Sequence, residues 1–315
     1  MVTPFKNRVF GCVVVKSINS NYNADFSHQP RTLPDGTVYA TDKVLKYSVR
    51  NWLKKTSPED KVFYFKTLSK EEMQPRSLGE TYIALFGEFP KNDGKDKDVK
   101  NRKEVLKNLL TCTDVRLFGG TFAEKGVSLS IHGTTQITHG VNRFPENAVY
   151  SEQISSPFRN ANAKSEDSMQ TTLGTQFKLR EGHYVHHFSV NPHNLDDLVT
   201  LSGGQTLNDE DVAKLKAGLS RGVTLYDSSA KSGTENELLL WVQLKADSKL
   251  VLPSFVELVS IADDDKRTID LSKVSAVLGR EHVKAAIEKI ELWYDSTATT
   301  VTGVPEGAVI QEIHQ

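Results

Sequence analysis

Hydrophobic residues fall along this chain in two patterns, dense runs typical of strands and three-to-four-residue spacings typical of helices. The dense runs predict strands at residues 8–18, 184–190, 238–244, 255–261 and 290–294, the last of them expected to be the final strand. Shorter strands are predicted at 62–65, 127–131 and 135–138. The helical spacings predict helices at 41–55, 101–110, 209–221 and 281–286. Strands and helices in this order predict an α+β fold of the ferredoxin-like, or RRM-like, kind.

The helix predicted at 41–55 has two faces of opposite character, with Thr41 as its expected N-cap. At about 100° per residue, apolar residues fall on one side: Leu45, Val49, Trp52 and Leu53. Basic residues fall on the other side: Lys43, Lys46, Arg50 and Lys54. Because no acidic residue follows Asp42 in this helix, we expect the i,i+4 ion pairs of a solvated helix to be missing. The pattern favours a contact with a polyanion over a merely solvated face.

The helix predicted at 209–221 has both of its ends marked in the sequence. Asn208 is the expected N-cap and Gly222 the expected stop. Its buried face is predicted to contain Val212, Leu215 and Leu219.

Two stretches show neither pattern. Residues 91–100 are charged and contain a glycine, which predicts a surface loop. Periodicity is also lost over 142–182, where 159–172 consist almost entirely of polar and small residues. Such a segment cannot form a core, so we expect a loop or hairpin that projects from the domain.

Charge is distributed unevenly along the chain. The net charge of the 315 residues is −1, which argues against nucleic-acid binding by bulk charge. The first 55 residues nevertheless contain nine basic residues against three acidic ones. The sequence shows neither a signal peptide nor a membrane-spanning run, so we expect a cytoplasmic protein without a membrane partner.

The sequence contains no motif for familiar enzyme chemistry. It has neither a phosphate-binding loop of the G-x-x-x-x-G-K-[ST] type nor a G-x-S-x-G nucleophile elbow. The two cysteines, Cys12 and Cys112, lie in apolar stretches and are expected to be buried. On a strand, His183 and His187 would share one face while His186 points to the other, so they do not converge on a metal. We therefore expect a protein that is not an enzyme and needs no cofactor.

Four groups of residues follow one another in an order that covers almost the whole chain. The first comprises Asn19, Asn21, Pro30-Arg31, Gly36, Thr41-Asp42, Leu45-Lys46 and Arg50-Asn51. The second is the apolar segment 114–119, which breaks into the double glycine Gly119-Gly120. The third is Gly133 with Gln136-Ile137, and the fourth runs from Gly182 and Tyr184 to Asn191-Pro192. Together they resemble the Cas-seven (Cas7) family, the backbone subunits of type I CRISPR Cascade complexes. The likeness is to the Csh and Csd branches, which points to subtype I-B or a close relative.

The resemblance implies a hand-like architecture. An RRM-like palm is expected to be built from residues 1–53, 113–141 and 183–315. Residues 54–112 would form a helical finger insertion, and residues 142–182 would form a thumb hairpin.

The resemblance also implies a set of residues that contact guide RNA. Lys46 and Arg50, with Lys43, would hold phosphates from the helix. Asn19, Asn21 and Arg31 would line a loop beside the guide, and Arg116 with Gly119 and Gly120 would let the backbone approach the RNA. Further expected contacts are Gln136, Lys178 and Lys231. In the thumb, Ile154 and Phe158 would wedge between bases.

The implied function is to coat a guide (crRNA) and present it for pairing with target DNA. Copies of the chain would assemble head to tail as a filament and join other Cascade subunits. Two alternatives stay open. One is a metal-dependent endoribonuclease of the type III kind, using Asp25. The other is a single-strand RNA-binding protein that works alone.

Overall fold

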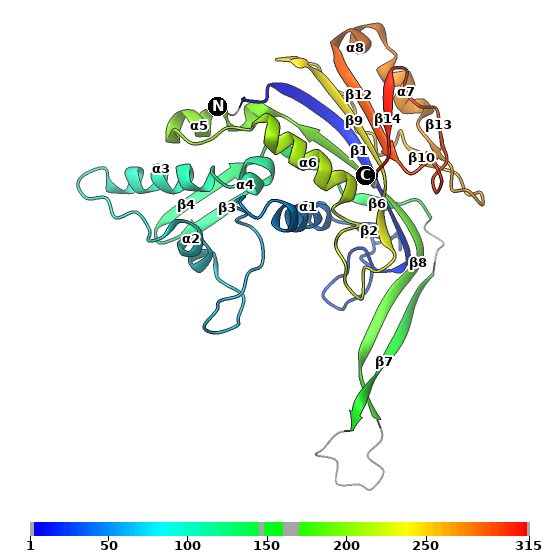
Figure 1. Ribbon diagram of the computed structural model, residues 1–315, viewed down its shortest axis with the longest axis horizontal. Coiled ribbons are helices and arrows are strands. Elements are labelled where there is room, and N and C mark those ends of the chain that lie inside the picture. Colours follow the sequence, from blue (N-terminus) through cyan, green and yellow to red (C-terminus); the bar gives the residue numbers. More distant parts are fainter. Residues whose placement is uncertain (1–2, 145–147, 160–169, 314–315) are drawn as a thin grey trace.

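The computed structural model describes residues 3–144, 148–159 and 170–313, and these form a mixed α+β protein (Figure 1). Its centre is four antiparallel strands in the order β12-β9-β1-β8. Their bounds are β1, Asn7–Ser20; β8, Gln170–Val190; β9, Thr234–Ala246; and β12, Ile287–Tyr294. The short strands β2 (Tyr39–Ala40), β5 (Thr135–Ile137) and β6 (Gly140–Asn142) extend the sheet beyond β8, and β14 (Ala308–Gln311) extends it beyond β12. The α+β class predicted from the sequence is confirmed.

The central strand β1 is buried on both faces, which explains why its sequence is a continuous apolar run. Val13 and Val15 point into the core on one side of the sheet. Cys12 and Val14 point into the core on the other side. The sheet is therefore the middle layer of the molecule.

Helices α1 (Asp42–Thr56) and α6 (Asp209–Arg221) cover the first face of the sheet. As predicted, Leu45, Val49 and Leu53 of α1 are buried, whereas Trp52 is only partly buried. The helices pack closely because Gly218 of α6 lies against Val49.

The ends of these two helices are set by different contacts. Asn208 caps α6 as expected, and its side chain and that of Asp211 form a reciprocal capping box. Thr41 stands at the N-cap position of α1, but its side chain makes no capping bond. Its hydroxyl donates instead to Asn23 Oδ1, at 3.0 Å, which ties the start of α1 to the loop after β1.

The C-terminal quarter of the chain covers the second face. It contains α7 (Ser272–Leu278), α8 (Glu281–Ala286) and a small sheet of β10 (Ser260–Ile261), β11 (Ile269–Asp270) and β13 (Val301–Thr302). The helix predicted at 281–286 is confirmed. The strand predicted at 255–261 is wrong except for its last two residues, because the carbonyl of Phe255 accepts bonds from Leu258 and Val259 in a turn. The expectation that 290–294 is the final strand is also wrong, since β13 and β14 follow it.

A third cluster lies beside the sheet and contains much of the expected finger region. It is built from α2 (Leu78–Phe86), α3 (Lys97–Leu109), α4 (Thr113–Phe118), the β-hairpin of β3 (Gly119–Glu124) and β4 (Val127–His132), and α5 (Asp196–Ser202) after a 3₁₀ turn at Pro192–Leu195. The sequence pattern missed α2, although Ser77 and Glu80 form its capping box. The surface loop expected at 91–100 is shorter than predicted because α3 begins at Lys97. The strand predicted at 62–65 is wrong, because the backbone N–H groups of Phe63 and Tyr64 donate to the Asp114 carboxylate and not to a neighbouring strand.

The projecting segment predicted at 142–182 is a long hairpin of β7 (Val149–Arg159) and the first half of β8 (Figure 1). Its strands leave the body where β8 leaves the central sheet. Residues 160–169, which include most of the polar stretch at 159–172, lie outside the described residues. Of the helices described here, none is both long and apolar enough to cross a membrane.

Candidate nucleic-acid interface

Three of the predicted basic residues of α1 are paired with acids, and the side chains of Lys46 and Arg50 are only 13% and 12% exposed. Lys46 Nζ lies 3.0 Å from Asp42 Oδ2, and Arg50 Nε lies 2.9 Å from Asp114 Oδ2. The expectation that ion pairs are missing from this helix is therefore wrong. Lys46 and Asp42 form an i,i+4 pair at the start of the helix. The partner of Arg50 is Asp114 of α4, which the sequence of α1 alone cannot reveal. Lys43 is 83% exposed, 3.6 Å from Asp42.

Arg50 and Lys46 share an aromatic surface formed by α4 and the loop that follows α1. The guanidinium of Arg50 lies 5.1 Å from the centroid of the Phe118 ring and 5.9 Å from that of Tyr64. Lys46 Nζ lies 5.9 Å from the Phe118 centroid. The structure therefore places these two cations side by side over one ring.

Asp114 holds Arg50 and the loop of Tyr64 together through hydrogen bonds. Its carboxylate is fully buried and accepts the backbone N–H groups of Phe63, at 2.7 Å, and Tyr64, at 3.0 Å, as well as Arg50 Nε. In the described part of the chain, the two terminal nitrogens of Arg50 make no hydrogen bond. Asp114 thus fixes the guanidinium while leaving its outer donors available to an anion. Sequence analysis assigned no role to Asp114.

Gly119 and Gly120 are both in close contact with other segments of this chain. Gly119 has φ +66°, and a Cβ there would collide with the backbone of Ile131 and Gly133. A Cβ at Gly120 would collide with the Tyr64 ring. Both glycines are therefore explained by internal close approach, and the expected approach of RNA at these positions stays a prediction.

Arg116 does not join the basic face. Its side chain is 5% exposed, and Nε and Nη2 donate to the two carboxylate oxygens of Asp211 at 2.7 and 2.6 Å. Nη1 donates to the carbonyl of Leu110 at 2.8 Å. Burial raises the pKa of Asp211 although Arg116 lowers it. As the structure stands, Arg116 holds α4 to α6 and does not reach a surface, contrary to the expected RNA contact.

The end of β1 and the loop that follows it contain three of the predicted residues. Asn19, in the left-handed region at φ 48°, accepts a bond from the Tyr150 hydroxyl at 3.1 Å. Asn21 is buried and donates to the carbonyls of His28 and Phe177, at 3.1 and 3.4 Å. Arg31 Nε donates to the Ala24 carbonyl at 3.1 Å. The asparagines therefore join this loop to the β7–β8 hairpin.

The remaining predicted contacts come from three separate segments, which are β5, β8 and the turn before β9. Gln136 is exposed and donates to the Gly133 carbonyl at 3.0 Å. Lys178 pairs with Glu152 across the hairpin at 3.1 Å. Lys231 donates to the Tyr22 carbonyl, and burial lowers the pKa of its ammonium to about 8.

The two residues expected to wedge between bases are exposed on β7. Ile154 is 43% exposed and Phe158 is 77% exposed. Neither belongs to a core cluster of the described residues. Their exposure leaves both side chains available to another molecule.

Sequence analysis missed an aromatic cluster beside the basic face. Tyr47 of α1 stacks on Phe65, with ring centroids 5.1 Å apart, and lies 5.2 Å from Tyr226. The position of Tyr47 between Lys46 and Arg50 was a signal, because at helical spacing it borders the basic stripe. Its two partners come from distant loops and gave no sequence signal.

The predicted geometry of the three histidines is confirmed. On β8, His186 contacts the Tyr22 hydroxyl at 3.3 Å on one side of the sheet. His183 bonds to Glu237 at 2.7 Å, and His187 accepts the Phe255 N–H at 3.2 Å, on the other side. Among the described residues, no group of three or more His, Cys, Asp and Glu side chains is placed to hold a metal. The cysteines Cys12 and Cys112 are buried, as expected.

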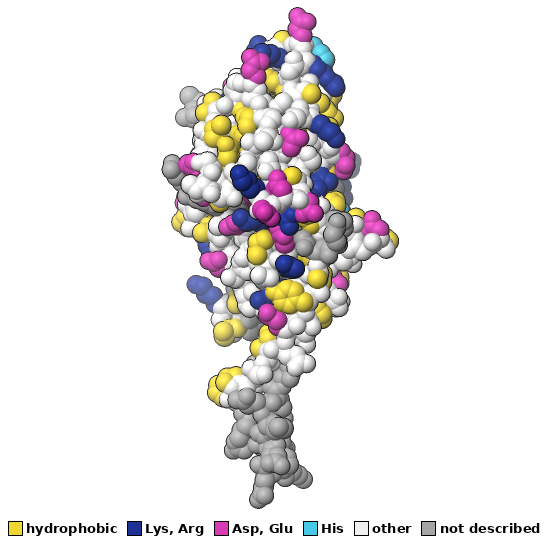
Figure 2. All heavy atoms as spheres, turned by 90° about the vertical axis from the view of Figure 1, so that its right-hand side faces the viewer, with side chains coloured by type: hydrophobic (Ala, Val, Ile, Leu, Met, Phe, Trp, Pro, Cys, Tyr) yellow, Lys and Arg dark blue, Asp and Glu magenta, His cyan; other side chains and the backbone are white. Residues whose placement is uncertain are grey.

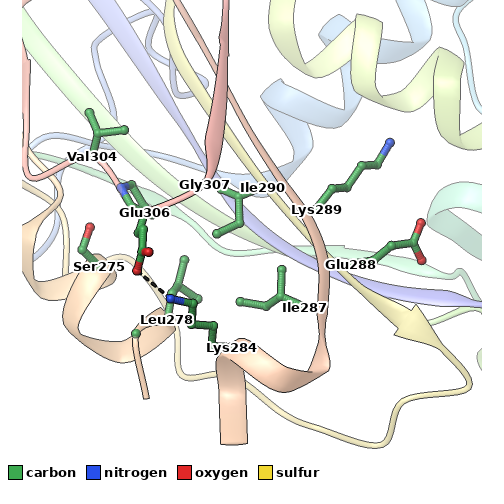
Figure 3. A pocket seen from close by; sticks show the side chains of 12 residues that line it. Ser275, Leu278, Lys284, Ile287, Glu288, Lys289, Ile290, Val304, Glu306 and Gly307 are labelled. Atoms are coloured by element: carbon green, nitrogen blue, oxygen red, sulfur yellow. Dashed lines mark hydrogen bonds and ion pairs between the residues drawn. The ribbon is translucent and has the colours of Figure 1, made fainter. Parts of the chain in front are cut away.

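A separate hollow of about 410 Å³ lies at the β14 edge of the main sheet, between α7, α8 and β12 (Figure 3). Leu278, Ile287 and Ile290 line it, together with an ion pair of Lys284 and Glu306 at 2.7 Å. None of the predicted RNA-binding residues contributes to it. Figure 2 shows basic and acidic side chains interspersed on this side of the molecule. The basic face of α1 has no counterpart there.

Comparison with known proteins shows what this chain resembles. The family model for CRISPR-associated protein Cas7 matches residues 7–277. In a search of curated proteins, none matches. A solved chain from a "CRISPR RNA-guided surveillance complex, pre-nicking" is 14% identical, with a TM-score of 0.59 over 97% of both chains. A chain from a "CRISPR RNA-guided surveillance complex" is also 14% identical, with a TM-score of 0.45 over 93% of this chain and 95% of that one. The first of these likenesses shows a shared fold.

Proposed function

Because this chain belongs to the CRISPR-associated protein Cas7 family, we propose that it is a guide-RNA-binding backbone subunit of a type I CRISPR interference (Cascade) complex. The observation that carries the proposal is the pair of cations on α1, Lys46 and Arg50, held over the Phe118 ring and next to the Tyr47 cluster. A cationic helix face bordered by aromatic rings suits a ribose-phosphate chain.

The parts of the molecule take the roles of a hand in this proposal. The palm is the RRM-like central sheet with α1 and α6, from residues 1–53, 113–141 and 183–315. The fingers are residues 54–112, which include α2 and α3. The thumb is residues 142–182, which include the projecting hairpin of β7 and β8.

Phosphates bind in this proposal at cations that are already oriented. Asp114 holds Arg50 through Nε alone, so a phosphate oxygen can accept from the terminal nitrogens without breaking the existing pair. Lys46 can pair with a phosphate and with Asp42 together because an ammonium has three donors. Such contacts are independent of base sequence, as a subunit that coats any guide requires.

The partners follow from this role. Each copy grips a segment of crRNA, and copies associate head to tail so that the contact does not close. The exposed Ile154 and Phe158 of the thumb separate bases at intervals, which leaves short segments free to pair with target DNA. Other Cascade subunits cap the filament in the cytoplasm, in a complex of subtype I-B or a close relative.

The double variant Lys46→Ala/Arg50→Ala tests the proposed RNA grip. We expect weaker guide binding for every RNA sequence, and a slope of log affinity against log salt that is shallower by roughly one to two units. Fluorescence anisotropy with labelled guides at several salt concentrations measures both quantities.

The matched control removes the same charge from another helix, through Lys100→Ala/Lys103→Ala on the exposed side of α3. Unfolding curves show whether loss of the Arg50–Asp114 pair has destabilised the first variant. Equal guide affinity and salt slope in wild type and the α1 variant would refute the assignment of this face.

The type III alternative is tested by incubation with complementary RNA and magnesium: cleavage that disappears in Asp25→Ala would support it.

A further inference from the structure

A nearly fully exposed phenylalanine stands on the turn that follows β1. Phe26 is 99% exposed, more than any other large hydrophobic residue among those described. Its neighbours Ser27, His28 and Gln29 are also exposed and polar. Phe26 therefore adds nothing to the core and belongs to no apolar patch of its own turn.

The turn around Phe26 is held in one conformation by a dense set of hydrogen bonds. Asp25 Oδ1 accepts the backbone N–H groups of Ser27, at 2.8 Å, and Gln29, at 3.0 Å. The backbone N–H of Asp25 donates to the Gln29 carbonyl at 2.8 Å. These bonds also lower the pKa of the Asp25 carboxyl group. A side chain presented from such a turn loses little conformational freedom when it binds.

The same turn is joined to the proposed guide-binding parts on both sides. Asn23 Oδ1 accepts the N–H of Thr41 at 2.8 Å, which connects the turn to the start of α1. Ala24 and His28 line a hollow of about 470 Å³ together with Ile154 of the hairpin. Phe26 therefore projects from the segment that bridges the basic helix and the proposed thumb.

A cation, Arg31, belongs to the same loop as the exposed ring. Arg31 Nε donates to the Ala24 carbonyl at 3.1 Å. Within the described part of the chain, the terminal nitrogens of Arg31 make no hydrogen bond. An exposed aromatic ring on the same loop as a guanidinium whose terminal nitrogens make no hydrogen bond to the described residues matches a nucleotide, whose base can stack while its phosphate binds the cation. An apolar protein partner would be expected to meet a cluster of apolar side chains, and this turn offers one ring among polar neighbours.

We propose that Phe26 stacks on a nucleobase of the bound guide RNA, at the junction between α1 and the β7–β8 hairpin. The proposal rests on the proposed function and adds to it a base-contacting residue on the palm side of the hairpin. Asp25 is then a positioning residue, which holds the turn that presents the ring. Stacking requires a π-face and no particular base, so the contact suits a subunit that binds any guide.

The test compares Phe26→Ala, Phe26→Leu and Phe26→Trp in guides that contain 2-aminopurine at successive positions. Wild type and the Trp variant should quench or shift the fluorescence of the probe at one position for each bound protomer. The Ala and Leu variants should lose that signal and bind guide RNA about tenfold more weakly. Val251→Ala, which shortens another exposed hydrophobic side chain, should match wild type.

The Phe26→Leu variant distinguishes base stacking, which needs an aromatic ring, from simple apolar contact. A Leu variant that keeps wild-type affinity and fluorescence overturns the proposal, as does an Ala variant without any change. All Phe26 variants should unfold at the wild-type denaturant concentration because the ring is exposed. A wild-type protein that binds no guide RNA contradicts the proposed function itself, and that result is visible before any variant is compared.

Discussion

At the scale of single residues, the sequence identifies cations but not the direction in which they point. Arg50 and Arg116 were both expected to lie at the guide RNA, Arg50 as a phosphate contact and Arg116 where the backbone approaches the RNA. In the structure both side chains are held by acids and are mostly buried, 12% exposed for Arg50 and 5% for Arg116. Among the described residues, Arg50 bonds through Nε alone, whereas both terminal nitrogens of Arg116 donate hydrogen bonds within the protein. The difference lies in acids 64 and 95 positions away along the chain. No local pattern could have distinguished the two arginines.

Arg116→Met should destabilise the fold strongly, because it leaves the Asp211 carboxylate buried without its cation. A loss of about 3–5 kcal/mol in the free energy of unfolding is expected. The double variant Arg116→Met/Asp211→Leu should recover most of that stability, because no charge is then left buried without a partner. It should not recover the part that comes from the capping bonds between Asp211 and Asn208, which the Leu side chain cannot make. Denaturant unfolding measures both variants. If Arg116→Met unfolds like wild type and weakens only guide binding, Arg116 is an RNA contact after all.

At the scale of elements, amphipathic helices were predicted well and isolated apolar runs were not. The helices at 41–55 and 209–221 were found within a residue of their predicted ends, since caps and apolar spacing agreed. The run at 62–65 was mistaken for a strand, although its backbone N–H groups donate to the Asp114 carboxylate. The run at 255–261 was also mistaken for a strand, although it begins in a turn at Phe255. Periodicity alone cannot distinguish these cases. The hairpin was predicted from polarity, and its residues Ile154 and Phe158, which the family resemblance placed against bases, are exposed.

Strand β8 carries two buried histidines that make stability depend on pH. Burial lowers the pKa of His186 and of His187 to about 4, from an ordinary value of 6.5. Between these two values the unfolded chain binds protons that the folded chain does not. The stabilising effect is therefore complete above about pH 6.5 and is lost as pH falls toward 4, by up to about 3 kcal/mol for each histidine.

His186→Gln should flatten this dependence, because the amide keeps hydrogen-bonding capacity without titrating. Unfolding free energies of wild type and variant are compared from pH 7 to pH 4. Identical slopes would show that folding does not lower the pKa of His186.

At the scale of the whole molecule, the order of motifs was more informative than overall composition. A net charge of −1 gives no hint of a nucleic-acid partner. The structure explains how a nearly neutral chain can still present cations: Lys43, Lys46 and Arg50 lie on one helix face, and the side viewed in Figure 2 has mixed charge. Family membership was foreseen from four groups of residues in order. The C-terminal layer that covers the second face of the sheet was only partly foreseen, because its strands are very short.

The nucleic acid that co-purifies with this chain tests the central claim most directly. The protein is expressed in cells that carry a CRISPR array, purified, and its bound nucleic acid is sized and sequenced. The account predicts RNA of uniform length that contains repeat and spacer sequence, in particles longer than a single protomer. A protein free of RNA, or one that carries cellular RNA in the proportions of the lysate, would contradict it.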